Sequence, residues 1–193
     1  MNKSEITVLV DMDDTIENLC DAWVNYLNKE HNLSVSPSDI VHWDMCKAFP
    51  SLSKTQVYKP LHDPNMWKSV TPKKDAQIYL KRLIDDGYSV YLCTSTNYDV
   101  TTPKMTYILN RYFPYIDWKK LITAHDKFMI RGDIIIDDGP HNFDSSRRLC
   151  ILYDTPHNQE FDDCASSNTV RAHGWEDVYN IVGRYYDKWS NFQ

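Results

Sequence analysis

Glycine and long apolar segments are both scarce in this sequence. Only 5 of its 193 residues are glycine, and no run approaches the roughly 20 apolar residues that a membrane-spanning helix needs. With 42% hydrophobic residues and so few glycines, the composition excludes low-complexity disorder and predicts a folded globular protein. The polar segment 1–5 leads directly into an apolar run, so we expect a cytoplasmic protein that does not span a membrane.

Excess basic charge and paired cysteines are also lacking. The 21 Lys and Arg residues are outnumbered by 27 Asp and Glu residues, which gives a net charge of -6. This balance argues against binding of a nucleic-acid polymer, because phosphate backbones require clustered basic side chains. The 5 cysteines include no CxxC pair, so we expect neither a disulfide framework nor a zinc site.

An apolar run that ends in acids stands near the start of the chain. The segment Ile6–Val10 is rich in β-branched residues and predicts a buried strand, and Asp11, Asp13 and Asp14 follow it at once. Open α/β sheets bind ligands at the carboxyl ends of their strands, which would place these acids in a site. For acids after a single strand, a turn that caps the next helix is the more common explanation, so the rest of the chain has to decide.

The remaining chain alternates between strand and helix patterns. Four further apolar runs predict strands at 88–93, 119–123, 133–137 and 149–153. Helical spacing of apolar residues predicts helices at 71–86, 102–112, 141–148 and 175–189. This alternation predicts an α/β fold with a doubly wound (Rossmann-like) parallel sheet and right-handed crossovers.

A helical segment interrupts the alternation after the first strand. A helix is expected over 17–30, and three prolines divide the following residues into short pieces. We therefore expect a core domain made of residues 1–15 and 71–193. Residues 16–70 are expected to form a small helical cap inserted after the first strand.

Polar groups follow four of the expected strands. After the acids of the first strand come Thr94 and Ser95, then Lys127, and then the pair Asp137 and Asp138. Parallel strands end at one edge of a sheet, so these groups should converge. Clustered carboxylates repel one another unless a cation binds among them, and all-oxygen ligands favour Mg²⁺. Such a site suits a phosphoryl group that is neutralised by the hydroxyl and ammonium groups and attacked by a carboxylate.

The order of these groups resembles the four motifs of the haloacid dehalogenase-like (HAD) superfamily. The matching segments are Asp-x-Asp-x-Thr at 11–15, Thr-Ser at 94–95, Lys127, and Gly-Asp-x-x-x-Asp-Asp at 132–138. The early cap, LeuCysThrSer at 92–95 and HisAspLys at 125–127 are similar to the 5′(3′)-deoxyribonucleotidases within that superfamily. The resemblance implies a Mg²⁺-dependent phosphomonoesterase that acts on (deoxy)nucleoside monophosphates through an aspartyl-phosphate intermediate.

The same resemblance assigns catalytic and phosphate-binding roles. Asp11 is the expected nucleophile and Asp13 the general acid and base, and Thr94 and Lys127 complete the catalytic group. Thr94, Ser95 and Lys127 are expected to bind the phosphate oxygens. A second acid also favours a phosphatase over a dehalogenase, because a halide leaving group needs no proton donor.

Metal and substrate contacts follow from the same comparison. Mg²⁺ ligands are expected at Asp11, Asp13 (through its carbonyl), Asp137 and Asp138. Asp138 could instead orient Lys127 or a metal-bound water, and a simple acid in a turn is the competing interpretation. The candidate substrate contacts are Leu19, Trp43 and Thr96. For the cap aromatics Trp23, Trp43, Tyr58 and Trp67, packing of a small subdomain competes with contact to a base.

Some features depart from the family pattern or leave alternatives open. Asp14 stands where glycine is common, and Gly139 follows the acid pair where some members place an arginine that helps to recognise substrate. The pair Arg147 and Arg148 is interpreted as a solvated helix end. A HAD phosphatase that acts on a sugar phosphate or another small phosphate ester is an alternative. A receiver domain of a response regulator is a more distant one, because receivers carry their Lys last in the chain.

The expected partner is a small phosphate ester, most simply a nucleoside monophosphate. No nucleic-acid polymer and no membrane are expected as partners. The sequence leaves the oligomeric state open, a homodimer included.

Overall fold

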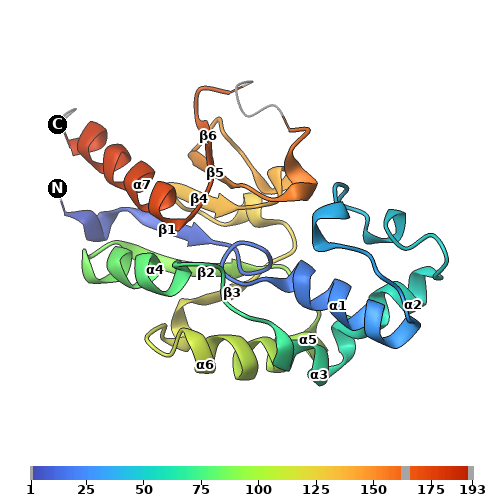
Figure 1. Ribbon diagram of the computed structural model, residues 1–193. Coiled ribbons are helices and arrows are strands. Elements are labelled where there is room, and N and C mark those ends of the chain that lie inside the picture. The colour runs from blue at the N-terminus through green and yellow to red at the C-terminus, as the bar shows by residue number, and fades with distance from the viewer. Residues whose placement is uncertain (1, 162–165, 191–193) are drawn as a thin grey trace.

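A computed structural model describes residues 2–161 and 166–190, and its centre is a six-stranded sheet (Figure 1). The strands are β1 (Thr7–Val10), β2 (Ser89–Thr94), β3 (Leu121–Thr123), β4 (Ile134–Asp137), β5 (Leu149–Tyr153) and β6 (Thr169–Ala172). All pairs are parallel, in the order β3-β2-β1-β4-β5-β6. The α/β prediction is confirmed, with one strand more than expected. The edge strand β6 was missed because Thr-Val-Arg-Ala contains no apolar run.

The sheet changes direction beside β1. The chain continues from β1 to β2 and β3 on one side, and from β4 to β5 and β6 on the other. Helix α4 (Ala76–Asp85) precedes β2, whereas α5 (Tyr98–Lys104) and α6 (Asn110–Tyr112) connect β2 to β3. Doubly wound sheets bind ligands where the two halves diverge, outside the carboxyl ends of the strands. In this protein that place lies between the ends of β1 and β4.

The two faces of the sheet are packed differently. Side chains alternate along β1, so that Val8 and Val10 join the large hydrophobic core and Leu9 joins a smaller cluster on the opposite face. Helices α4 and α7 (Trp175–Ser190) pack together against the large core, as Figure 1 shows. The smaller cluster is covered in part by Ile130 from the loop between β3 and β4. That loop, which carries Lys127, is therefore packed against the sheet.

Residues 16–70 contain α1 (Leu19–His31), α2 (Lys54–Tyr58) and α3 (Pro64–Ser69). Helices α1 and α2 lie beyond the carboxyl end of β1 (Figure 1). They surround a hydrophobic cluster of their own, made of Trp23, Val24, Leu27, Ile40, Met45, Phe49 and Val57. Helix α3 instead contributes Met66 and Trp67 to the large core. The assignment of residues 16–70 to a separate cap domain stays a prediction.

Three helix predictions differ from the structure. Helix α4 starts at Ala76 and not at residue 71, because the preceding segment pairs with the chain leaving β1: the Lys73 amide donates to Ile16 O at 2.9 Å. Helix α5 starts at Tyr98 and contains Pro103, and a π-helical turn at Met105–Leu109 follows its last residue, Lys104. The expected helix at 141–148 is only a 3₁₀ turn at Pro140–Asn142.

No helix among the described residues is both long enough and apolar enough to cross a bilayer.

Candidate active site

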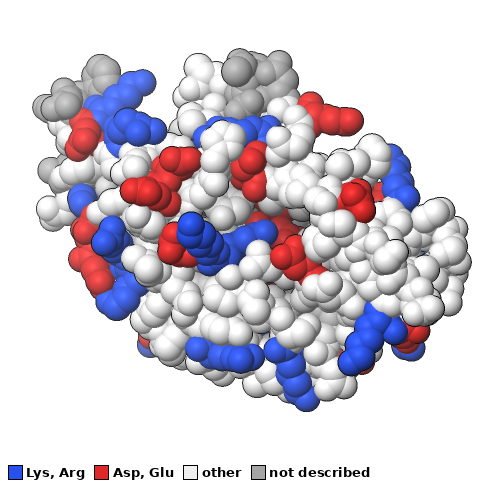
Figure 2. Space-filling view, in the orientation of Figure 1, with Lys and Arg blue, Asp and Glu red and all other residues white. Residues whose placement is uncertain are grey.

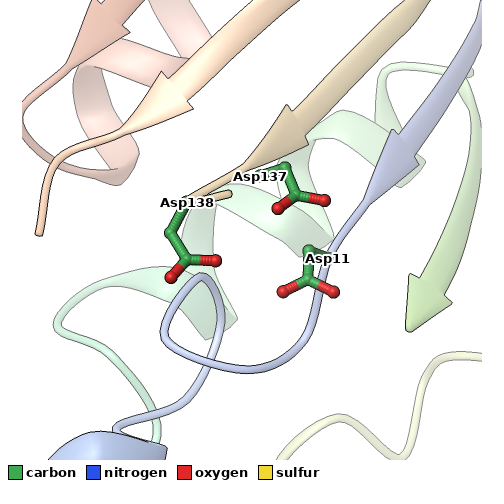
Figure 3. A group of neighbouring side chains, drawn as sticks. All are labelled: Asp11, Asp137 and Asp138. Carbon is green, nitrogen blue, oxygen red and sulfur yellow. The ribbon is translucent and has the colours of Figure 1, made fainter. Parts of the chain in front are cut away.

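Three carboxylates meet where the two halves of the sheet diverge (Figure 3). Asp11 directly follows β1, and its amide donates to Ile136 O at 2.8 Å, which fixes its backbone to β4. Asp137 ends β4, and Asp138 follows it. All three residues are buried, and one oxygen from each lies within 4.8 Å of the others. The sheet therefore brings together acids that are far apart in the sequence, as expected.

Lys127 lies among these carboxylates. It begins a 3₁₀ turn in the β3–β4 loop, it is only 2% exposed, and its Nζ donates to Asp11 Oδ1 and, at 2.7 Å, to Asp137 Oδ2. Burial raises the pKa of Asp11 to about 7, although the Lys127 ammonium opposes this effect. Burial alone would lower the pKa of Lys127, but Asp11 and Asp137 outweigh it and hold that pKa above its ordinary value. Lys127 is therefore charged at neutral pH.

The second acid of the pair is held by groups that follow β5. His157 Nε2 lies 2.7 Å from Asp138 Oδ2, and Asn158 Nδ2 donates to the Asp138 carbonyl at 2.9 Å. Burial lowers the pKa of His157 to about 4, so its imidazole is neutral near pH 7. Burial also raises the pKa of Asp138 well above its ordinary value, so the proton of this hydrogen bond belongs to the His157–Asp138 pair. Asp137 is fixed in a similar way by the Gly139 amide at 2.8 Å and by Asn142.

The donor set at this place fits a hard divalent cation. Asp11, Asp137 and Asp138 offer only oxygen atoms, and a single ammonium cannot neutralise three buried carboxylates. These residues could hold Mg²⁺, as the sequence predicts. The Asp13 side chain is not part of this group of three, and a role for its carbonyl stays a prediction.

Asp13 and Thr94 are joined by a residue that sequence reasoning missed. Lys104, which ends α5, is only 3% exposed. Its Nζ lies 2.6 Å from Asp13 Oδ2 and 2.9 Å from Thr94 Oγ1. The sequence did hold a signal, because Lys104 is four residues from both Val100 and Ile108 on the apolar face of the helical pattern. A charged residue on that face requires a partner in the interior.

Lys104→Met is expected to lower kcat by about 10- to 100-fold with little change in KM, because Asp13 loses the contact that orients it. Steady-state kinetics on a phosphate monoester measure this effect. The exposed Lys68, replaced by methionine, is the matched control and should leave both constants unchanged. An increase in KM at constant kcat would instead make Lys104 a substrate-binding residue.

Glu17 is a second buried group that sequence reasoning missed. It is 0% exposed, and among the described residues no N–H or hydroxyl group donates to its carboxyl oxygens or to Asp13 Oδ1. A carboxyl–carboxyl hydrogen bond joins Glu17 to Asp13. Burial, followed by the charge of Asp13, raises the pKa of Glu17 well above its ordinary value. In the sequence this residue was the expected first residue of the helix over 17–30, and nothing in the local pattern marked it as buried.

Glu17→Gln is expected to raise the Tm of the metal-free protein at about pH 8 and to change it little at about pH 5. A neutral Glu17 stabilises the fold fully below its ordinary pKa of 4.5, and this stabilisation is lost as the pH rises towards the raised pKa. Glutamine cannot ionise, so the difference in Tm should grow with pH. Thermal melts over this range measure it, and a constant difference would contradict the buried-acid explanation.

Asp14, the departure from the family pattern, has a local role. Its backbone is left-handed, with φ of 53°, and its carboxylate accepts the Cys20 amide at 3.1 Å. Lys73 lies 3.4 Å away, and burial raises the Asp14 pKa to about 6. The side chain thus caps the first turn of α1.

A cavity of about 590 Å³ opens over the carboxylates and is lined by both the core and residues 16–70. Leu19 and Trp43 line it, and Ser95 lines both this cavity and an adjoining one of about 420 Å³. Thr96 lines only the adjoining cavity. Trp43 lies across the main cavity, with its ring 4.6 Å from that of His141 and 5.0 Å from that of His157.

Of the other cap aromatics, Trp23 and Tyr58 also line the main cavity, whereas Trp67 lines the adjoining one. On the face in view, Lys and Arg side chains occur in small groups beside Asp and Glu (Figure 2). The two cavities share Asp13, Leu19 and Ser95 in their linings, and the roles of these residues stay predictions.

Comparison with known proteins defines the family. The profile of the family described as 5′ nucleotidase, deoxy (Pyrimidine), cytosolic type C protein matches residues 4–186. The chain belongs to this family. It is 30% identical over 172 residues to a 5′(3′)-deoxyribonucleotidase of Bacillus subtilis, covering 89% of this chain and 95% of the relative. A 5′(3′)-deoxyribonucleotidase of Clostridium acetobutylicum is 29% identical over 175 residues, with 91% and 92% covered.

The fold comparison agrees. A haloacid dehalogenase-like hydrolase from Streptococcus pneumoniae superposes with a TM-score of 0.62 at 13% identity, covering 91% of this chain and 97% of that chain. The protein is thus a phosphatase of the HAD superfamily, as the sequence motifs predicted.

Proposed function

We propose that this phosphatase removes phosphate from deoxynucleoside monophosphates through an aspartyl-phosphate on Asp11, with Mg²⁺ as cofactor and the cytoplasm as its setting. The observation that carries the proposal is the contact of Lys127 with both Asp11 and Asp137 beneath a cavity lined with aromatic residues. The two 5′(3′)-deoxyribonucleotidase relatives support this substrate class.

In the first step Asp11 attacks the phosphorus and the ester bond to the nucleoside oxygen breaks. Asp13 gives its proton to that oxygen, so the nucleoside leaves as a neutral alcohol. Lys127 neutralises charge on the phosphoryl oxygens, and the hydroxyls of Thr94 and Ser95 hydrogen-bond to them. Bound Mg²⁺, held by Asp11, Asp137 and Asp138, would supply further positive charge to these oxygens.

In the second step Asp13 removes a proton from water, and the resulting hydroxide attacks the phosphorus. The bond between phosphorus and Asp11 breaks, which releases inorganic phosphate and restores both acids. Lys104 supports both steps, since its contacts to Asp13 and Thr94 hold the acid–base group beside the phosphate-binding hydroxyl.

Residues 16–70 are proposed to act as a cap that closes over the nucleoside and sets specificity. Leu19 and Trp43 line the main cavity together with residues of the core, which supports this assignment. Trp43 is 54% exposed although it is apolar, as expected for a ring that contacts a ligand.

The test is a phosphatase screen with Mg²⁺ over deoxynucleoside, ribonucleoside and sugar monophosphates, repeated in EDTA. Deoxynucleotides should be hydrolysed fastest, and EDTA should stop turnover. In Trp43→Ala, KM for nucleotides should rise by about 10-fold while that for a small aryl phosphate stays the same. Preferred hydrolysis of a sugar phosphate, or full turnover in EDTA, would contradict the proposal.

A further inference from the structure

Arg148 was interpreted from the sequence as a solvated helix end, and the structure contradicts this. The residue lies just before β5 and is only 5% exposed. Its guanidinium donates three hydrogen bonds to the loop that carries Lys127. Nη1 lies 3.0 Å from Ile130 O, and Nη2 lies 3.3 Å from Phe128 O and 3.4 Å from Lys127 O. The neighbouring Arg147 is exposed and pairs locally with Asp144.

The partners of Arg148 are unusual for a buried cation. Among the residues that the structure describes, no carboxylate lies within ion-pair distance of it, so its hydrogen bonds to carbonyls satisfy the charge. These carbonyls belong to one short turn whose own backbone bonds are few: Ile130 donates to Lys127 O, and Met129 donates to Asp126 O. A planar guanidinium can hold several carbonyls of one turn together, which an ammonium cannot do in the same geometry.

The contact also connects Lys127 to the strand that carries its partner. Arg148 precedes Leu149, which pairs with Ile134 at the start of β4, and Asp137 ends the same strand. The Leu149 amide donates to Asp133 O at 3.0 Å. The backbone of Lys127 is thus fixed, through Arg148, relative to the β4–β5 pair.

We propose that Arg148 is a positioning residue that holds the Lys127 ammonium at the phosphate site. The proposal rests on the proposed function, because it takes Lys127 as a phosphate-binding group. Arg148 does not touch the phosphate. It holds the turn without lining the cavity, and its loss leaves three carbonyls without this donor. Lys127 then samples positions away from the phosphoryl group.

The test compares Arg148→Lys and Arg148→Ala with the native protein. In each variant the inhibition constant of inorganic phosphate, a competitive inhibitor, should rise by about 10- to 100-fold. The kcat/KM values for a nucleotide and for an aryl phosphate should fall in the same proportion. Millimolar guanidinium should restore part of the activity of Arg148→Ala, whereas methylammonium should not. Arg147→Ala is the matched control and should behave as the native protein.

Phe143→Leu separates positioning from general stability, since Phe143 packs on the same small cluster as Ile130. This variant should lower Tm without lowering the affinity for inorganic phosphate. If it lowers phosphate affinity as much as Arg148→Lys does at an equal loss of Tm, Arg148 has only a structural role and the proposal is overturned. Phosphate affinity within twofold of native in both Arg148 variants overturns it as well. Arg148→Lys keeps the charge and the aliphatic stem, so it is the decisive variant if Arg148→Ala does not fold.

Phosphate binding can be measured by calorimetry without turnover, which keeps this proposal separate from the proposed function. A native protein that hydrolyses no nucleotide but loses phosphate affinity on Arg148→Lys contradicts the substrate assignment and supports the role of Arg148. If the native protein hydrolyses nucleotides and the Arg148 variants bind phosphate as tightly as it does, the substrate assignment is supported and the proposed role of Arg148 is overturned.

Discussion

Asp11→Asn is expected to abolish turnover, with kcat falling by at least about 10⁴-fold. The amide has nearly the shape of the carboxylate but cannot attack phosphorus, so the covalent step is lost. Asp13, Thr94 and Lys127 keep their positions and still recognise the phosphoryl group. Single-turnover assays with Mg²⁺ and a nucleotide measure the effect, and calorimetry measures whether phosphate still binds.

Asp11→Asn should also change the way in which Tm depends on pH. Because the Asp11 pKa is raised to about 7, its neutral form stabilises the metal-free fold fully below the ordinary value of 3.8. This stabilisation is lost as the pH rises through 7, so Asp11→Asn should gain Tm relative to the native protein at alkaline pH. Activity within 100-fold of native would remove Asp11 from the nucleophile position.

Lys127→Met should be the most destabilising single change in the site. It leaves Asp11 and Asp137 facing each other without the ammonium that contacts both, and breaking a buried pair in this way costs about 3–5 kcal/mol. Loss of the same charge from the phosphate site should lower kcat/KM by about 10³-fold. Urea unfolding in EDTA measures the first effect and steady-state kinetics the second.

A divalent cation provides the internal control for this prediction. Mg²⁺ should restore part of the stability of Lys127→Met, because a cation among the three carboxylates replaces the missing positive charge, but it should not restore kcat/KM. Lys81→Met is the surface control, since the Lys81–Asp85 pair is about half exposed and should contribute under about 1 kcal/mol. If Lys127→Met and Lys81→Met lower the free energy of unfolding equally, the buried Lys127 contributes no more to stability than the exposed Lys81.

The strand-end residues of the site could be predicted because their signal is local. An apolar run gives a strand, parallel strands end at one edge, and polar residues at those ends converge, as Asp11, Lys127 and Asp137 do. Thr94 is linked to Asp13 through Lys104. The element boundaries were less predictable. Thr102 and Pro103 suggested a helix start, but the chain was already helical from Tyr98.

The sequence by itself determined the α/β fold, the family and the acids that follow β1 and β4, because periodicity and motif spacing are properties of the chain alone. The partners of buried charges were decided only by the tertiary structure. Lys104 reaches Asp13 across 91 residues, and Lys127 reaches Asp11 across 116. Arg148 looked like a surface residue in the sequence because its carbonyl partners lie in a different loop, which only the tertiary structure brings near it. A local pattern can mark a charged side chain as inward-facing, but only packing brings the group that makes its burial tolerable.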